Sequence, residues 1–128
     1  MKIEKINYTG IRVRDAKKAT EFLGDLIGSP FPEIAEVEEH DVKMSIHPIG
    51  IEIIEPLSAD GAPARALKSR GEGLSHICLK VANLEEAIAE MKARDVRLIA
   101  RLEGSAIFHP ADTFGVMIEF SDHDLTSR

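Results

Sequence analysis

The sequence predicts an α+β fold in which two tandem βαβββ modules form a curved, open sheet with a cleft. Three observations support this prediction: segments that alternate like strands, an amphipathic helical segment after the first strand of each half, and a weak internal repeat. The repeat aligns Tyr8 with His76 and Asp15 with Asn83, each pair 68 positions apart. We therefore expect one domain over residues 1–128, with modules at about 4–58 and 72–121 and a connector at 59–71.

The first module begins with a strand at residues 5–13, where polar and apolar side chains alternate. Asp15 then favours the start of a helix and Gly28 its end, and the apolar face between them comprises Ala19, Phe22, Leu23, Leu26 and Ile27. Three further strands are expected, two of them as a hairpin at residues 33–39 and 42–48 and the third at GIEIIEPL, residues 50–57.

The second module repeats this order. GLSHICLKV, residues 73–81, predicts a strand, and Asn83 predicts the N-cap of a helix whose inner face comprises Leu84, Ala87, Ile88 and Met91. Three more strands are expected at residues 97–100, 106–109 and 115–120. A short helix is expected around residues 63–69 of the connector.

The composition excludes several classes of function. The single cysteine, Cys78, rules out an intrachain disulfide and a multi-thiolate metal site. A net charge of −6 argues against a nucleic-acid partner. No apolar run approaches the ~20 residues that cross a bilayer, and the N-terminus carries no cleavable apolar leader, so we expect a cytoplasmic protein that does not bind membranes. The open edge strands of such a sheet favour a homodimer.

Four side chains are candidates for a shared site: Tyr8, Glu52, His76 and Glu119. Each lies on the first or last strand of its module, and a pseudo-twofold pairing of the modules would gather such positions around the axis. Both glutamates have apolar neighbours, which predicts that they line a cleft instead of a solvated surface. Ionised carboxylates in such a place need a partner, and a divalent cation would serve.

Several local strings extend this pattern: GIRVRDAKKATEFL, IEIIEPL, APARALKSRGEGLSHI and FHPADTFGVMIEF. Together they resemble the vicinal oxygen chelate superfamily, which includes glyoxalase I, extradiol dioxygenases, bleomycin-resistance proteins and methylmalonyl-CoA epimerases. The resemblance runs over about residues 5–120 and is strongest to the epimerase branch. It implies a glyoxalase-like fold and a small-molecule substrate.

The resemblance also implies a divalent metal ion, namely cobalt, manganese, nickel or zinc, with iron also compatible, held by Glu52, His76 and Glu119. The remaining ligand position of the family, normally a histidine, falls on Tyr8. Three interpretations follow: a phenolate ligand that favours ferric iron, a hydrogen-bond donor to substrate beside a three-ligand metal, or loss of the metal. We favour the three-ligand site. His47, on the polar face of its strand, is a candidate replacement for the missing histidine.

For an epimerase, the resemblance implies proton transfer at the carbon α to the carbonyl of an acyl-CoA ester similar to methylmalonyl-CoA. Such a reaction needs acid–base groups on both faces of that carbon and stabilisation of an enolate oxygen. The matching carboxylates are Glu119 and Glu39. Arg12 and Lys80, equivalent in the repeat, are expected to hold a substrate carboxylate or phosphate. The alternatives are a glyoxalase I-like lyase or a dioxygenase on the same site, or a non-catalytic ligand-binding member of the superfamily.

Overall fold

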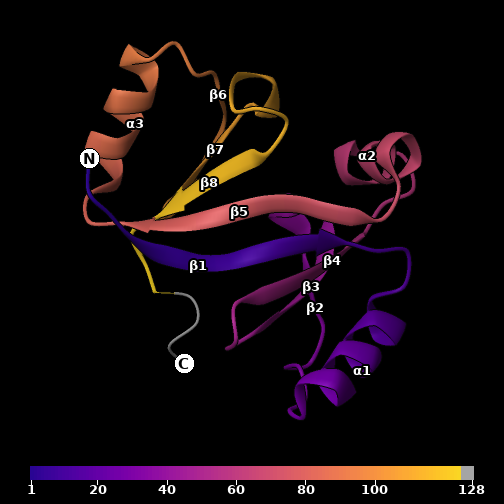
Figure 1. The fold of residues 1–128 in the computed structure, drawn as a ribbon. Coiled ribbons are helices and arrows are strands. Elements are labelled where there is room, and N and C mark those ends of the chain that lie inside the picture. The colour runs from indigo at the N-terminus through magenta and orange to yellow at the C-terminus, as the bar shows by residue number, and fades with distance from the viewer. Residues whose placement is uncertain (125–128) are drawn as a thin grey trace. The chain divides into compact units, whose positions relative to one another are not determined.

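The computed structural model of the protein describes residues 1–124 and is drawn as a ribbon in Figure 1. Within that range the elements follow the order β-α-β-β-β twice, with one further α-helix between the two runs. The α+β class and the repeated βαβββ order predicted from the sequence are therefore confirmed. The residues form two compact units, one of Gly10–Leu74 and one that joins Met1–Thr9 to the chain from Ser75 onward. No helix among the described residues is long and apolar enough to span a membrane.

The unit Gly10–Leu74 contains the end of one strand, three whole strands, two α-helices and a 3₁₀ turn: β1 (Ile3–Arg12), α1 (Ala16–Ile27), β2 (Ala35–Val37), η1 (Glu38–His40), β3 (Val42–His47), β4 (Ile51–Pro56) and α2 (Ala62–Arg70). Its strand order is β2-β3-β4, with the last residues of β1 beside β4. β3 pairs antiparallel with both of its neighbours, and its residue Ile46 lies opposite Glu52 of β4. The predicted connector helix is confirmed as α2.

Helix α1 begins and ends where the sequence predicts. The Asp15 carboxylate accepts a hydrogen bond at 3.1 Å from a backbone N–H of the first turn. Gly28 closes the last turn in the left-handed conformation, at φ 83°, where a glycine has no steric penalty. The helix packs on a core around Val13, Ala16 and Ile53.

The predicted apolar face of α1 is only partly buried. Phe22 and Leu26 are 68% and 73% exposed. The fully buried positions of the helix are Ala16 and Gly24. A Cβ at Gly24 would come within 3.4 Å of a backbone oxygen in the loop that follows the helix. α1 therefore packs through Ala16, Gly24, Ala19 and Leu23, whereas Phe22 and Leu26 of the predicted face remain on the surface.

The second unit contains most of β1 and five further elements of regular structure, together with a 3₁₀ turn: β5 (Gly73–Val81), α3 (Leu84–Ala93), β6 (Leu98–Leu102), β7 (Ser105–Phe108), η2 (Pro110–Asp112) and β8 (Met117–Ser121). Its strand order is β1-β5-β8-β7-β6. β5 and β8 run parallel, whereas β7 is antiparallel to β8 and β6 (Figure 1). The first and last strands of the chain are therefore both next to β5.

A separate core holds this second unit together. Helix α3 is capped by the Asn83 side chain, as predicted, and packs on the inner faces of β7 and β8. The rings of Phe108 and Phe120 lie there with centroids 5.3 Å apart, and burial of each contributes about 1.5–3 kcal/mol. Because side chains alternate along a strand, Phe120 in this core directs Glu119 to the opposite face of β8.

The observed strands differ from the prediction mainly around the first hairpin. Its first arm shortens to β2, because residues 38–40 wind into η1 and Asp41 takes a left-handed conformation at φ 56°. The Asp41 carboxylate accepts hydrogen bonds from the Ser58 N–H and hydroxyl, at 3.0 and 2.6 Å, which ties this turn to the chain after β4. β8 begins at Met117 instead of residue 115, because the preceding loop has positive φ at Phe114 and Gly115.

An ion pair beside β6 should leave a measurable pH signature. Asp112 accepts hydrogen bonds from the backbone N–H, Nε and Nη2 of Arg97, at 2.9, 2.9 and 3.1 Å. The side-chain and backbone hydrogen bonds from Arg97 hold the pKa of Asp112 at about 2, below its ordinary 3.8. Because the folded-state pKa is the lower one, the pair stabilises the fold above pH 3.8, and this contribution is lost as the pH falls toward 2.

We expect carboxyl NMR to show Asp112 titrating near pH 2 in the wild type and at a higher pH, closer to 3.8, in Arg97→Gln, which loses the side-chain donors but keeps the backbone N–H donor. The difference in unfolding free energy between the two proteins should shrink as the pH falls between these values. Arg94→Gln, which removes an exposed ion pair with Glu90, is the matched control and should leave the Asp112 titration unchanged. An Asp112 that titrates near 3.8 in the wild type would contradict the prediction.

Candidate functional site

A buried hydrogen bond between β1 and β8 marks the candidate site. The Tyr8 hydroxyl donates to Glu119 Oε1 at 2.8 Å. Tyr8 is 4% exposed and Glu119 is 6% exposed. The bond is shielded from bulk water, and its donor fixes the orientation of the carboxylate.

His76, on β5, lies against the same carboxylate. Its Nε2 is 4.0 Å from Glu119 Oε1, and its ring meets the Tyr8 ring edge-on with centroids 5.8 Å apart. The other ring nitrogen, Nδ1, is 3.1 Å from the Ser75 hydroxyl. When that hydroxyl accepts the Nδ1 proton, the lone pair remains on Nε2, the nitrogen on the Glu119 side. This tautomer is the one that binds a metal ion through Nε2.

One cluster of this unit therefore combines a carboxylate, an imidazole and a phenol, and it brings together three of the predicted site residues. A phenol that donates a hydrogen bond to a carboxylate is in its neutral form, and its partner here is Glu119. The cluster offers two kinds of chemistry. The carboxylate can accept a proton, and the carboxylate and imidazole together can bind a cation.

Two further predicted residues belong to the unit Gly10–Leu74. Glu52, on β4, is 6% exposed. Glu39 lies on η1 and is exposed. Glu52 therefore has the burial expected of a residue that lines a site, whereas Glu39 has the exposure of a turn residue.

The two predicted substrate-binding cations have different surroundings. Arg12 is 8% exposed, and its Nε donates to the Gly71 carbonyl oxygen at 3.0 Å. Lys80 forms an ion pair with Glu4 at 2.8 Å, and this contact lowers the pKa of Glu4. Because a carboxylate already balances the charge of Lys80, Arg12 is the better candidate for holding a substrate anion.

His47, the candidate replacement for the missing histidine, is engaged in packing. It is 5% exposed, its Nδ1 accepts a hydrogen bond from the Ile49 N–H at 3.0 Å, and its ring lies edge-on to Phe31 with centroids 5.0 Å apart. Acceptance at Nδ1 places the ring proton on Nε2, which has no hydrogen-bond partner within residues 1–124. A nearby aromatic face can partly satisfy such an N–H group. These contacts favour a structural role.

The fit of a metal ion can be judged from the donors in the Tyr8 cluster. Across residues 1–124, no group of three or more His, Cys, Asp and Glu side chains is arranged to hold an ion. His76 Nε2 and Glu119 Oε1 are nevertheless 4.0 Å apart. Two donors with bonds of ~2.1 Å to one ion lie about 3.0–3.4 Å from each other, so the pair would close by less than about 1 Å. Nitrogen and carboxylate oxygen are donors that divalent transition metals accept.

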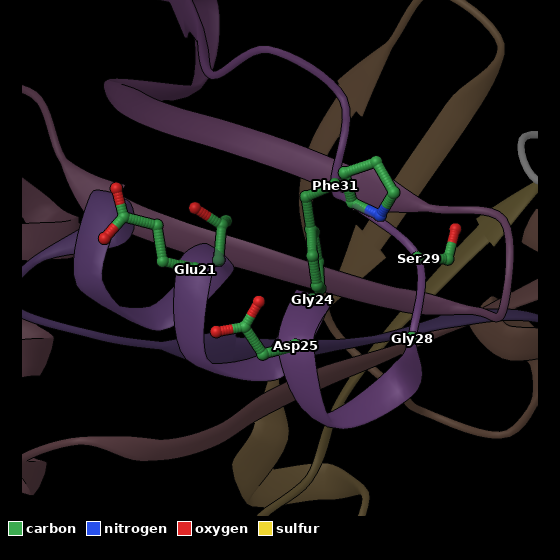
Figure 2. A pocket seen from close by; sticks show the side chains of 8 residues that line it. Glu21, Gly24, Asp25, Gly28, Ser29 and Phe31 are labelled. Carbon is green, nitrogen blue, oxygen red and sulfur yellow. The ribbon is translucent and has the colours of Figure 1, made fainter.

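A hollow of about 690 Å³ beside α1 is lined by none of the predicted site residues. Figure 2 shows the carboxylates of Glu21 and Asp25 and the ring of Phe31 among the side chains that line it. Two carboxylates would repel an anionic ligand. The hollow is therefore unsuited to a substrate that carries carboxylate or phosphate groups.

Comparison with known proteins places these features in a family. The model of the glyoxalase/bleomycin resistance protein/dioxygenase superfamily matches residues 7–109. The chain belongs to this superfamily. The residues that match the family model include Tyr8, Glu52 and His76, whereas Glu119 lies beyond the end of the match.

Within the superfamily, the chain resembles methylmalonyl-CoA epimerases. The human mitochondrial methylmalonyl-CoA epimerase is 29% identical over 126 residues, which cover 90% of this chain and 72% of the relative. Protein YqjC of Bacillus subtilis is 30% identical over 130 residues, which cover 94% of this chain and 93% of the relative. The crystal structure of methylmalonyl-CoA epimerase from Mycobacterium tuberculosis matches with a TM-score of 0.82 at 22% identity, covering 93% of this chain and 87% of that one. The glyoxalase-like fold and the resemblance to the epimerase branch are therefore confirmed.

Sequence reasoning missed two polar residues of this unit, Ser75 beside the cluster and Asn7 next to Tyr8 in the chain. Ser75 contacts the His76 ring, and its place directly before His76 was the available signal. Asn7 is 1% exposed, and its side-chain N–H group donates to the His123 carbonyl oxygen at 2.9 Å and lies 3.8 Å from Cys78 Sγ. Nothing in the sequence pattern pairs Asn7 with a residue 116 positions further on.

Proposed function

We propose that the protein is an epimerase that moves a proton at the carbon α to the carbonyl of an acyl-CoA thioester similar to methylmalonyl-CoA. The observation that carries this proposal is the buried Glu119 carboxylate, held by the Tyr8 hydroxyl at 2.8 Å beside His76. Relatives named methylmalonyl-CoA epimerase, which align with about nine-tenths of the chain, support the same substrate class.

In this proposal Glu119 is the base on one face of the α-carbon. The α-hydrogen passes to the carboxylate as a proton, and the electron pair of the broken C–H bond moves toward the carbonyl, whose oxygen becomes an enolate. A proton delivered to the opposite face restores the C–H bond with inverted configuration. Atoms and electrons balance without a co-substrate. Tyr8 acts as a positioning residue, because its hydroxyl orients the carboxylate and favours the ionised form that accepts the proton.

The acid for the opposite face is Glu39, the position that the family resemblance assigns. One turnover leaves Glu119 protonated and Glu39 deprotonated, so both groups must exchange protons with water before the next turnover in the same direction. The exposure of Glu39 on η1 supports this exchange.

A divalent metal ion is assigned to His76, Glu119 and Glu52. Bound there, it would act as a Lewis acid that stabilises negative charge on the enolate oxygen. His76 Nε2 and Glu119 supply a nitrogen and an oxygen donor within one unit, and the family resemblance assigns Glu52 as the third ligand. Cobalt, manganese, nickel and zinc ions accept this set of donors, and iron does so as well.

Proton exchange in D₂O tests the proposal. We expect methylmalonyl-CoA to lose its α-proton NMR signal when incubated with the protein and a divalent metal ion, because deuterium returns in place of the abstracted proton. Glu103→Gln, a change of an exposed carboxylate between β6 and β7, should exchange at the wild-type rate. Absence of exchange with every malonyl-type thioester and every metal ion would contradict the proposed reaction. The metal content of the same samples, by mass spectrometry, tests the metal assignment separately.

Ligand binding without catalysis is a second candidate function, and Tyr8 is the observation that favours it. Its neutral hydroxyl donates to Glu119 at the position where the family resemblance expects a metal-binding histidine. For a binding protein, calorimetry would detect the thioester while the α-proton remained unexchanged at every metal concentration.

The homodimer expected from the sequence remains a prediction. The edge strands support it: β2 is the edge strand in one unit and β6 is an edge strand in the other. The unpaired backbone groups of an edge strand can pair with a second chain. The cytoplasmic location also remains a prediction.

A further inference from the structure

Arg12 is a buried cation that lacks a carboxylate partner in its own unit. The residue is 8% exposed, and the ion pairs found within Gly10–Leu74 do not include it. Burial lowers the pKa of Arg12, and the positive charge of nearby Arg70 lowers it further. A charge in such surroundings is costly unless an anion accompanies it.

The two acidic residues that flank this part of the chain are engaged elsewhere. The Asp15 carboxylate caps helix α1. Glu72 binds Arg14 through both oxygens, with Oε2 accepting from the backbone N–H at 2.9 Å and Oε1 3.2 Å from Nη1. Arg14, whose side chain is 66% exposed, is therefore neutralised while the buried Arg12 is not.

The Arg12 guanidinium is held in a fixed orientation. Its Nε donates to the Gly71 carbonyl oxygen at 3.0 Å. Gly71 follows α2 with φ 76° and ψ −171°, a conformation that favours glycine. A Cβ at this position would meet no atom within 4 Å, so the backbone conformation, not lack of space, selects the residue. With Nε engaged, the two terminal nitrogens of Arg12 present four N–H groups in one plane.

The charge at this place matches a phosphate better than a carboxylate. Arg12 and Arg70, which lies in the last turn of α2, contribute two positive charges. A phosphate monoester carries a charge of about −1.5 to −2 at pH 7, whereas a carboxylate carries one negative charge. A planar guanidinium also binds two oxygens of one phosphate at once.

We propose that Arg12, supported by Arg70, binds a phosphate group of the kind carried by the nucleotide half of coenzyme A. The assignment of this phosphate to coenzyme A rests on the proposed function, in which the substrate is an acyl-CoA ester. The existence of an anion site rests only on Arg12 and its surroundings. Arg12 is then a substrate-binding residue that acts on the non-reacting part of the substrate.

Titration calorimetry with adenosine 3′,5′-bisphosphate tests this site without any turnover. We expect the bisphosphate to bind the wild type, and Arg12→Met to raise its Kd about 10- to 100-fold, because a charge-assisted pair of hydrogen bonds is lost. Arg70→Gln should raise the Kd less, by about 3- to 10-fold, because Arg70 is exposed. Arg14→Gln is the matched control, and its Kd should stay within about twofold of the wild type, because Arg14 is already paired with Glu72.

Stability provides a second readout that separates ligand binding from a structural role. The urea midpoint of Arg12→Met should equal or exceed that of the wild type, because an apolar side chain replaces a buried charge without a carboxylate partner. A lower midpoint together with unchanged bisphosphate binding would show that Arg12 is structural and would overturn the proposal. If Arg12→Met does not fold, Arg70→Gln decides, since unchanged binding in that exposed variant also overturns it.

Two probes identify the ligand chemistry. Adenosine, which lacks phosphate, should not bind, and malonate should bind at least tenfold more weakly than the bisphosphate. Absence of bisphosphate binding to the wild type, or a preference for malonate, would overturn the phosphate assignment. If the bisphosphate binds through Arg12 while no thioester exchanges its α-proton, the proposed reaction fails and the phosphate site stands.

Discussion

The Glu119→Gln variant is expected to exchange the α-proton of methylmalonyl-CoA about 10²- to 10⁴-fold more slowly than the wild type. An amide is not a base, yet it has nearly the shape of the carboxylate, and its oxygen can still accept the Tyr8 hydrogen bond. The loss therefore reports on the proton acceptor, not on packing. The rate is measured by NMR in D₂O at saturating thioester.

The same substitution should also weaken metal binding, because it replaces a charged ligand with a neutral one. Measuring the exchange rate over a series of metal concentrations separates the two effects, since a pure loss of affinity is restored at high metal and a loss of the base is not. Glu103→Gln, in the turn of the same unit, is the control at every concentration. A Glu119→Gln protein that exchanges within about threefold of the wild type at saturating metal would remove Glu119 from the role of base.

Tyr8→Phe should lower the exchange rate about tenfold and move the acid limb of its pH profile to higher pH. The variant keeps the ring that packs against His76 but loses the hydroxyl that donates to Glu119 at 2.8 Å. Without that donor the ionised carboxylate is less favoured, so more alkaline conditions are needed for it to act as base. Loss of a buried donor to a charged group should also lower the free energy of unfolding by about 1–3 kcal/mol, which urea titration would measure.

Tyr8→His is the companion variant, because it restores the residue type that the superfamily resemblance expects at this position. We expect it to raise the affinity for cobalt or manganese about tenfold or more, through one additional nitrogen donor. The pair of variants also distinguishes the interpretations of Tyr8. A visible absorption band that forms with ferric iron in the wild type and is missing in Tyr8→Phe would identify a phenolate ligand and contradict the role of neutral donor.

Local features of the fold were predictable because their causes lie within a few residues. Asp15 and Asn83 are short polar side chains placed directly before apolar helical patterns, and both cap helices in the structure. Gly28 ends α1 for an equally local reason. The contact between Tyr8 and His76 was also within reach, since the internal repeat aligns the two residues.

Side-chain contacts between residues that are distant in the sequence could not be predicted from the strand and helix pattern. Arg12 and Lys80 occupy equivalent positions of the repeat, yet Lys80 meets Glu4 whereas Arg12 lies near Arg70. The internal repeat could not predict this difference, because Glu4 and Arg70 do not occupy equivalent positions of the two modules. Tyr8 and Glu119 were predicted to share a site, but the hydrogen bond between them was not predicted, because the repeat gives positions on strands and not the contacts of individual atoms.

The unit that carries the Tyr8 cluster is assembled from both ends of the chain, whereas Gly10–Leu74 is continuous. During synthesis the continuous unit can form its contacts as soon as it emerges, but the N-terminal residues of β1 must wait for β5 and β8 to be made. Bringing such distant segments together requires closure of a long loop, whose entropic cost grows slowly with length. The carboxylate, imidazole and phenol therefore meet only after the last strand is complete. A nascent chain that stops before β8 lacks Glu119, so truncated products of translation would lack the base of the proposed proton transfer.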